Sequence, residues 1–227
     1  MMNEKQLTGQ EAGHIHFLKQ GPGIHREMLP AWLALEQATK EAGFHLAIAS
    51  GFRDFSRQLS IWNRKFCGEL AVKDDNNQIL VLENLSEKKC IHAIMRFSAL
   101  PGASRHHWGT DIDIYADNLL GEGQKLQLEP WEYHAGGPFS ELRLWLEHNC
   151  REFGFYFPYD TDRGGVAAEP WHLSYAPLAN QYRQMFTLEL LTRALAGQDI
   201  AGKESILALL PELYQQYIIN TAEVDFG

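Results

Sequence analysis

Apolar residues recur at helical spacing in two segments of the N-terminal half of the chain. Residues 25–42 carry such a stripe, with Pro30 in the first turn and Gly43 just after the last one. This spacing, opened by proline and closed by glycine, predicts a helix of four to five turns. Residues 54–66 repeat the pattern with Asp54 as the expected N-cap, so a second amphipathic helix is predicted there.

Shorter apolar runs in the same part of the chain predict strands. Residues 44–50 form one such run between the two helices. Residues 110–115 alternate between polar and apolar side chains. Because successive side chains of a strand point to opposite faces, this alternation places Asp111 and Asp113 on one face and the isoleucines between and after them on the other.

The pattern returns to a helix and then to strands in the second half. Residues 139–153 show helical spacing, and residues 154–159 are aromatic and typical of a strand. Residues 166–175 are predicted to form a further strand that carries Glu169 and His172. The sequence therefore predicts a small sheet surrounded by helices.

Three segments have a less defined pattern. Residues 67–100 are interpreted as an insertion or lid, within which residues 91–97 fit a helix or a strand. Residues 117–138 are rich in glycine and predict a long loop. Helical composition returns over residues 181–196 and 204–219, which we interpret as an extension packed on the core.

Composition limits the classes of protein to which the chain can belong. With 227 residues, 45% hydrophobic and 22% charged, it has ordinary globular composition, and we expect one domain. The net charge is −9, and the basic residues form no stripe, which argues against a nucleic-acid partner. No apolar run reaches the length that spans a membrane. The oligomeric state is left open.

The N-terminus and the cysteines bear on the compartment. Residues 1–19 are polar and contain no signal-peptide core. Cys67, Cys90 and Cys150 are odd in number and widely spaced, which argues against a disulfide framework. We expect a cytoplasmic protein as the chain stands, or a periplasmic or exported one if the true start lies upstream.

Imidazole and carboxylate side chains gather in two short segments. His106 and Asp113 lie in the first, and Glu169 and His172 lie in the second. A catalytic zinc site uses three protein ligands of these types and keeps one position open for water. His106, Asp113 and His172 meet that count, and Glu169 is close enough in sequence to His172 to act as a base in the same pocket.

Three motifs in a fixed order then carry a resemblance to a known family. They are Ser50-Gly51-Phe52-Arg53 with Gln58 five residues later, Ser104-x-His106-x-x-Gly109-x-x-x-Asp113, and Glu169-x-Trp171-His172. In this order they resemble the zinc D-alanyl-D-alanine carboxypeptidases of the VanY type. That group also includes D,D-dipeptidases, L,D-carboxypeptidases and phage L-alanyl-D-glutamate endopeptidases. The resemblance covers about residues 27–176.

The resemblance implies a role for each matching residue. It implies that Zn²⁺ is bound by His106, Asp113 and His172, and that Glu169 is the general base. Arg53 then falls on the position that stabilises the oxyanion or holds the substrate carbonyl, a task that suits a guanidinium. Two further matching positions are expected to contact substrate: Gln58 and Ser104.

Two residues beside the expected ligands are ambiguous. Asp111 shares a strand face with Asp113, so a second carboxylate is expected near the metal or in competition for it. His107 stands next to His106. The motif spacing selects His106 as the ligand, but periodicity alone does not.

These observations give one overall prediction. We expect an α+β fold over residues 1–227, in which a small antiparallel sheet carries the zinc site, helices flank it, and a helical extension covers about 178–227. The expected activity is removal of a C-terminal D-amino acid, D-alanine above all, from peptidoglycan-derived peptides. The alternatives are a peptidoglycan endopeptidase or D,D-dipeptidase with the same centre, and a non-catalytic cell-wall or metal-binding module. Glu169 and Arg53 disfavour that module, since neither is needed simply to hold zinc.

Overall fold

A four-stranded antiparallel sheet forms the structural basis of the site. The computed structural model describes residues 2–19 and 21–223, and the last residues of the expected extension, 224–227, lie outside that range. The sheet has the order β3-β4-β6-β5, and a separate hairpin pairs β1 with β2. The strands are β1 Ile15–Phe17, β2 Gly23–His25, β3 Leu46–Ser50, β4 Asp111–Ala116, β5 Phe155–Tyr156 and β6 His172–Tyr175.

Helices surround the sheet, so the α+β prediction is confirmed. They are α1 Glu4–Leu7, α2 Leu29–Glu41, α3 Phe55–Phe66, α4 Glu87–Met95, α5 Pro130–Tyr133, α6 Ser140–Asn149, α7 Ala176–Met185, α8 Leu188–Ala196 and α9 Lys203–Leu213. Asp54 caps α3 by accepting a hydrogen bond from a backbone N–H of its first turn, as predicted. The C-terminal part is helical, also as predicted. Within the described ranges, no helix has the length and apolar character that crossing a membrane requires.

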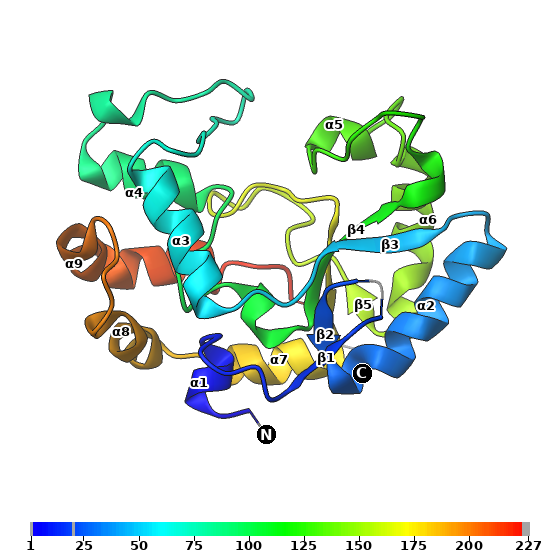
Figure 1. Ribbon diagram of the computed structural model, residues 1–227, viewed down its shortest axis with the longest axis horizontal. Coiled ribbons are helices and arrows are strands. Elements are labelled where there is room, and N and C mark those ends of the chain that lie inside the picture. The colour runs from blue at the N-terminus through cyan, green and yellow to red at the C-terminus, as the bar shows by residue number, and fades with distance from the viewer. Residues whose placement is uncertain (1, 20, 224–227) are drawn as a thin grey trace.

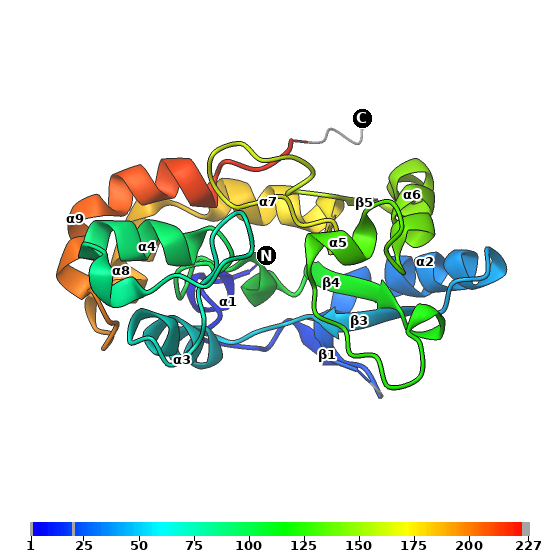
Figure 2. The ribbon, with the colours of Figure 1, turned by 90° about the horizontal axis from the view of Figure 1, so that it is seen from above.

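Two regions lie side by side in the molecule (Figures 1 and 2). The sheet region comprises β2 to β6 with α2, α5 and α6, and its core includes Ile112, Ile114 and Phe139. The helical region comprises α3, α4 and α7 to α9, and its core includes Trp62 and Leu191. Each region therefore buries its own apolar cluster.

The register of the sheet aligns three polar residues from distant parts of the chain. Asp113 on β4 lies opposite Ser50 on β3 and opposite His172 on β6. Ile112 and Ile114 belong to the apolar core of the sheet region, whereas Asp111 and Asp113 both contact His172, which confirms the predicted alternation along β4. The backbone pairing alone thus brings Ser50, Asp113 and His172 into one row.

Several expected boundaries differ from the structure. The strand expected over 166–175 begins only at His172, so Glu169 lies in the preceding turn, where Pro170 has no N–H to donate to a strand partner. The strand expected over 154–159 is limited to β5. The segment over 91–97 belongs to helix α4 as far as Met95.

Two further segments also differ. The loop expected over 117–138 contains the short helix α5. The single helix expected over 181–196 is divided into α7 and α8. The division occurs because the Thr187 hydroxyl accepts a hydrogen bond from the backbone N–H of Leu190 and starts a new helix.

Candidate active site

Three buried side chains from different elements meet at one point of the sheet region. Each of His106, Asp113 and His172 offers one ligand atom, and these atoms all lie within 4.8 Å of one another. His106 comes from the short 3₁₀ helix Arg105–Trp108, and the other two come from β4 and β6. The fold thus brings together the three residues that the sequence selected as ligands.

His106 is held with one ring nitrogen directed at the cluster. Its Nδ1–H donates to the backbone carbonyl of Gly51 at 3.0 Å, and its Nε2 lies 3.4 Å from Asp113 Oδ2. The 3₁₀ helix ends at Gly109, whose φ is 68°. A Cβ at Gly109 would lie 2.8 Å from the backbone nitrogen of His25, so only glycine permits this approach. Because the carbonyl of Gly51 occupies Nδ1, the Nε2 of His106 is the ring nitrogen that can bind a metal.

His172 presents its other ring nitrogen to the same point. Its Nδ1 lies 3.2 Å from Asp113 Oδ1 and 3.3 Å from Glu169 Oε2. In the part of the chain that the structure describes, His172 Nδ1 and Asp113 Oδ1 are buried atoms without a hydrogen-bond partner. Buried polar atoms are normally satisfied, and a cation between these two would satisfy both. Two imidazoles and one carboxylate are also a suitable donor set for zinc, so the residues fit that metal.

Asp111, left ambiguous by the sequence, lies behind His172 and outside the cluster. It accepts hydrogen bonds from His172 Nε2 at 3.0 Å, from Arg105 Nε at 2.7 Å and from Thr110 Oγ1 at 2.8 Å. Burial alone would raise the pKa of Asp111, but Arg105 and His172 hold it well below its usual range. A carboxylate that binds one nitrogen of a histidine fixes the ring and leaves the other nitrogen free for a metal.

His107 has a different environment from His106. It is fully buried, its Nε2 accepts from the backbone N–H of Gly102 at 3.1 Å, and its Nδ1–H donates to the backbone carbonyl of Arg53 at 2.6 Å. Both ring nitrogens are therefore occupied by the backbone. The structure brings His106, and not His107, to the cluster.

Arg53 lies beside the cluster with neutral partners. Its Nη1 donates to Gln58 Oε1 at 3.0 Å, and its Nη2 donates to Ser50 Oγ at 2.9 Å. Burial lowers the pKa of Arg53, and the carboxylates of Asp113 and Glu169 oppose that effect. Among the described residues, the guanidinium is thus held in place without a direct ion pair.

Arg53 lines the cavity, but Gln58 does not. It is fully buried, and its Nε2 donates to the backbone carbonyl of Ala99 at 2.7 Å while its Oε1 accepts from Arg53. Gln58 is not among the residues that line the cavity, whereas Ser104 is. The contact between Gln58 and substrate, expected from the resemblance, stays a prediction.

Glu169 reaches the cluster from the turn before β6. Its side chain is 13% exposed, and its backbone N–H donates to the carbonyl of Tyr159 at 3.0 Å. Burial raises the pKa of Glu169, and the charge of Asp113 adds to this, while His172 lowers it. A carboxyl with a raised pKa at this place is suited to accept and return a proton.

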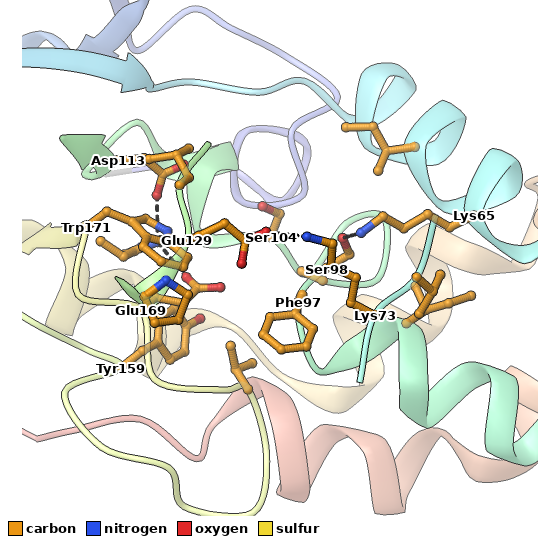
Figure 3. Close-up of a pocket in the computed structure, with 18 of the residues that line it drawn as sticks. Lys65, Lys73, Phe97, Ser98, Ser104, Asp113, Glu129, Tyr159, Glu169 and Trp171 are labelled. Carbon is orange, nitrogen blue, oxygen red and sulfur yellow. Dashed lines mark hydrogen bonds and ion pairs between the residues drawn. The ribbon is translucent and has the colours of Figure 1, made fainter. Parts of the chain in front are cut away.

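One cavity of about 430 Å³ joins these groups (Figure 3). Arg53, Ser104 and Glu169 line it together with the cluster, and so do residues of the helical region such as Lys65 and Phe97. Figure 3 shows Asp113, Glu169 and Tyr159 toward one end and Lys65 with Ser98 toward the other. These helical-region residues belong to no motif, so the sequence alone does not single them out.

Comparisons with known proteins agree with this geometry. The family model described as VanY, D-alanyl-D-alanine carboxypeptidase, matches residues 22–178. An uncharacterised protein of Haemophilus influenzae is 43% identical over 122 residues, which cover 53% of this chain and 93% of that protein. A D-alanyl-D-alanine carboxypeptidase of Enterococcus faecalis is 27% identical over 175 residues, which cover 76% of this chain and 55% of that protein.

Two solved structures are similar as well. VanYB in complex with D-alanine-D-alanine is 25% identical with a TM-score of 0.53, over 79% of this chain and 87% of that one. A vancomycin-resistance D,D-pentapeptidase VanY variant in complex with Zn(II) is 26% identical with a TM-score of 0.53, over 80% of this chain and 92% of that one.

Proposed function

The chain belongs to the VanY family of D-alanyl-D-alanine carboxypeptidases, and from that premise we propose that it is a zinc-dependent peptidase. Its proposed reaction is hydrolysis of the bond to a C-terminal D-amino acid, D-alanine above all, in peptidoglycan-derived peptides. The observation that carries the proposal is the buried cluster of His106, Asp113 and His172 with Glu169 and Arg53 in the same cavity. The similarity to a VanYB complex with D-alanine-D-alanine supports the substrate class.

The proposed metal ligands are His106 through Nε2, His172 through Nδ1 and Asp113 through its carboxylate. When bound, Zn²⁺ supplies a Lewis acid and lowers the pKa of a coordinated water. Asp111 holds the ring of His172 in the orientation that directs Nδ1 at the cluster. The similarity to a VanY variant in complex with Zn(II) supports the choice of metal.

Glu169 is proposed to move the proton of the reaction. Its carboxylate lies beside the cluster, 3.3 Å from His172 Nδ1. There it accepts a proton from the attacking water and donates it to the nitrogen of the leaving amino acid. The raised pKa of Glu169 makes it a stronger base than an exposed carboxylate, which favours acceptance of the proton from the attacking water.

Arg53 is proposed to stabilise the negative charge that develops on the scissile carbonyl oxygen. Gln58 and Ser50 fix its guanidinium before substrate binds, and such prior orientation is what makes an oxyanion contact effective. We assign Gln58 the task of orienting Arg53, and Ser104, on the cavity wall, the task of binding the peptide.

The test is to incubate the zinc-loaded protein with muropeptide tetrapeptides and pentapeptides and to identify the products by mass. We expect release of D-alanine. Glu169→Gln should keep its zinc, measured by metal analysis, and lose about 10²- to 10⁴-fold in kcat. Glu147→Gln, which removes an exposed carboxylate that pairs with Arg143, is the matched control.

The outcomes separate the alternatives. Release of D-alanine from neither peptide would overturn the carboxypeptidase proposal, and cleavage inside the peptide would replace it with an endopeptidase. Unchanged turnover in Glu169→Gln would remove Glu169 from the mechanism.

A further inference from the structure

The cavity is lined by cationic side chains that are paired with carboxylates and by two, Arg53 and Lys65, that have no such partner among the residues that the structure describes. Lys73 pairs with Glu129 at 2.6 Å, and Arg105 pairs with Asp111 at 2.7 Å. Within residues 2–19 and 21–223, the guanidinium of Arg53 bonds only to the neutral side chains of Gln58 and Ser50. Lys65 also has no carboxylate within ion-pair distance in the described ranges, and its ammonium donates to Ser98 Oγ at 2.7 Å.

Lys65 lies on the face of α3 that lines the cavity. Ile61 and Lys65 are four residues apart, which puts them on one side of the helix. Ile61 and Lys65 both line the cavity. Because side chains of a helix lean toward its N-terminus, Lys65 leans toward Arg53, which stands just before α3.

The ammonium of Lys65 has hydrogen-bonding capacity left. It carries three N–H donors, and the hydroxyl of Ser98 accounts for one. Burial lowers the pKa of Lys65, the charge of Arg53 lowers it further, and the charge of Glu169 raises it. Lys65 is therefore within electrostatic reach of both groups proposed for the reaction, and an added carboxylate would compensate its burial.

We propose that Lys65 binds a carboxylate of the peptide substrate, with Ser98 holding the ammonium in position. This inference rests on the proposed function, because the occupant of the cavity is then an acidic peptide. A charged donor and a carboxylate form one of the stronger hydrogen bonds in proteins. Two carboxylates qualify: the one at the C-terminus of the peptide and one on a side chain within it.

The experiment measures binding to the zinc-loaded Glu169→Gln protein by calorimetry, so that it does not depend on turnover. The probes are a synthetic peptide that ends in D-alanyl-D-alanine and contains one glutamate, the same peptide as its C-terminal amide, and the same peptide with glutamine for glutamate. Each is measured against Lys65→Met and Lys65→Arg introduced into that background. Lys88→Met, which removes an exposed lysine paired with Glu212, controls for the change in net charge.

We expect Lys65→Met to raise the dissociation constant of the free acid about 10- to 100-fold, as for a lost hydrogen bond to a charged group. Lys65→Arg should recover most of the loss, and Lys88→Met should show none. If the amide binds equally to the parent and to Lys65→Met, Lys65 binds the C-terminal carboxylate. If instead the glutamine peptide binds equally to the parent and to Lys65→Met, Lys65 binds the glutamate carboxylate within the peptide.

Two results would overturn the inference. Lys65→Met could bind all three peptides as its parent does, or the parent could bind none of them. The proposed function is judged separately, by release of D-alanine from the two free-acid peptides by the unmutated protein. A protein that releases D-alanine but gives either of these binding results would keep its proposed function and lose the role of Lys65.

Discussion

The sheet region and the helical region contribute to one cavity in different ways. In the sheet region the candidate ligands are placed by backbone register, since Asp113 and His172 are direct partners across β4 and β6. In the helical region, Ile61, Lys65 and Phe97 reach the cavity as side chains on or beside helices, with no backbone pairing between them. The proposed metal ligands thus come from the sheet region, and the proposed carboxylate-binding lysine comes from the helical region.

The two regions also differ in what they bury. Behind the candidate ligands, Arg105 donates to Asp111, Ser174 and the hydroxyl of Tyr156, so the sheet region buries a connected polar network. The core of the helical region is an apolar cluster. Substitutions in the polar network of the sheet region should therefore change metal binding, whereas substitutions in the helical region should change packing or substrate binding.

The largest expected effect is a difference in zinc retention between variants of the neighbouring residues His106 and His107. His106→Ala should abolish retention of zinc on dialysis and with it hydrolysis, because the cluster loses one of its three ligands. His107→Ala should keep its zinc and lose about 1–3 kcal/mol of stability, the cost of leaving buried backbone groups unpaired. Metal analysis and chemical denaturation measure the two quantities. Loss of zinc only in His107→Ala would exchange the two assignments.

The contact between the regions at His25 should respond to acid. The Glu27 backbone N–H donates to His25 Nδ1, so the proton is on Nε2, which donates to the Tyr182 hydroxyl at 2.9 Å across to α7. Burial lowers the pKa of His25 to about 4, with the charges of His14 and Arg26 adding to the effect. The folded state therefore binds this proton less readily than the unfolded state.

The sign follows from that difference. The stabilising contribution of neutral His25 to the free energy of unfolding is complete above about pH 6.5. As the pH falls toward 4, the free energy of unfolding decreases by an amount on the order of 3 kcal/mol. Denaturation at several pH values measures it, and His25→Gln should flatten the slope over this range. An unchanged slope would show that the contact does not couple stability to pH.

A moderate effect on metal affinity is expected from Asp111. Asp111→Ala should weaken zinc binding about 10- to 100-fold, because His172 loses the carboxylate that orients it. The single change also leaves Arg105 buried without its partner, so it is compared with Asp111→Ala combined with Arg105→Leu. Competition with a chelator gives the affinities. Recovery of affinity in the double variant would attribute the loss to the buried charge and not to the orientation of His172.

The sequence predicted the strands of the sheet region well because strand alternation can be read from a few neighbouring residues. Strand alternation placed Asp111 and Asp113 on one face, and both lie against His172 in the structure. The helical spacing and the N-cap of α3 were equally clear. The pairing of β4 with β6 was not readable from either strand, and the resemblance supplied what periodicity could not.

The features that the sequence did not predict depend on contacts that only the folded chain forms. The sequence left the role of Asp111 open because its partner His172 lies on β6 and reaches Asp111 only through the pairing of β4 with β6. The sequence pattern predicts Glu169 in a strand, but Glu169 begins a turn that the His172 N–H closes by donating to the Glu169 carbonyl, and the strand starts only at His172. Lys65 was missed because nothing in a helix pattern shows which face meets a cavity.

The smallest effect is expected at Lys73, which lines the same cavity as Lys65 but is already paired. Its bond to Glu129 is 2.6 Å long, yet its side chain is 37% exposed, and such partly exposed pairs contribute about 0–1 kcal/mol. Lys73→Met should therefore change kcat/KM by less than about threefold, against the larger loss expected for Lys65→Met. Steady-state kinetics on one peptide compares the two. Equal losses in both variants would mean that each lysine attracts the substrate through its charge whether or not it is paired, and the distinction between a paired and an unpaired lysine would not hold.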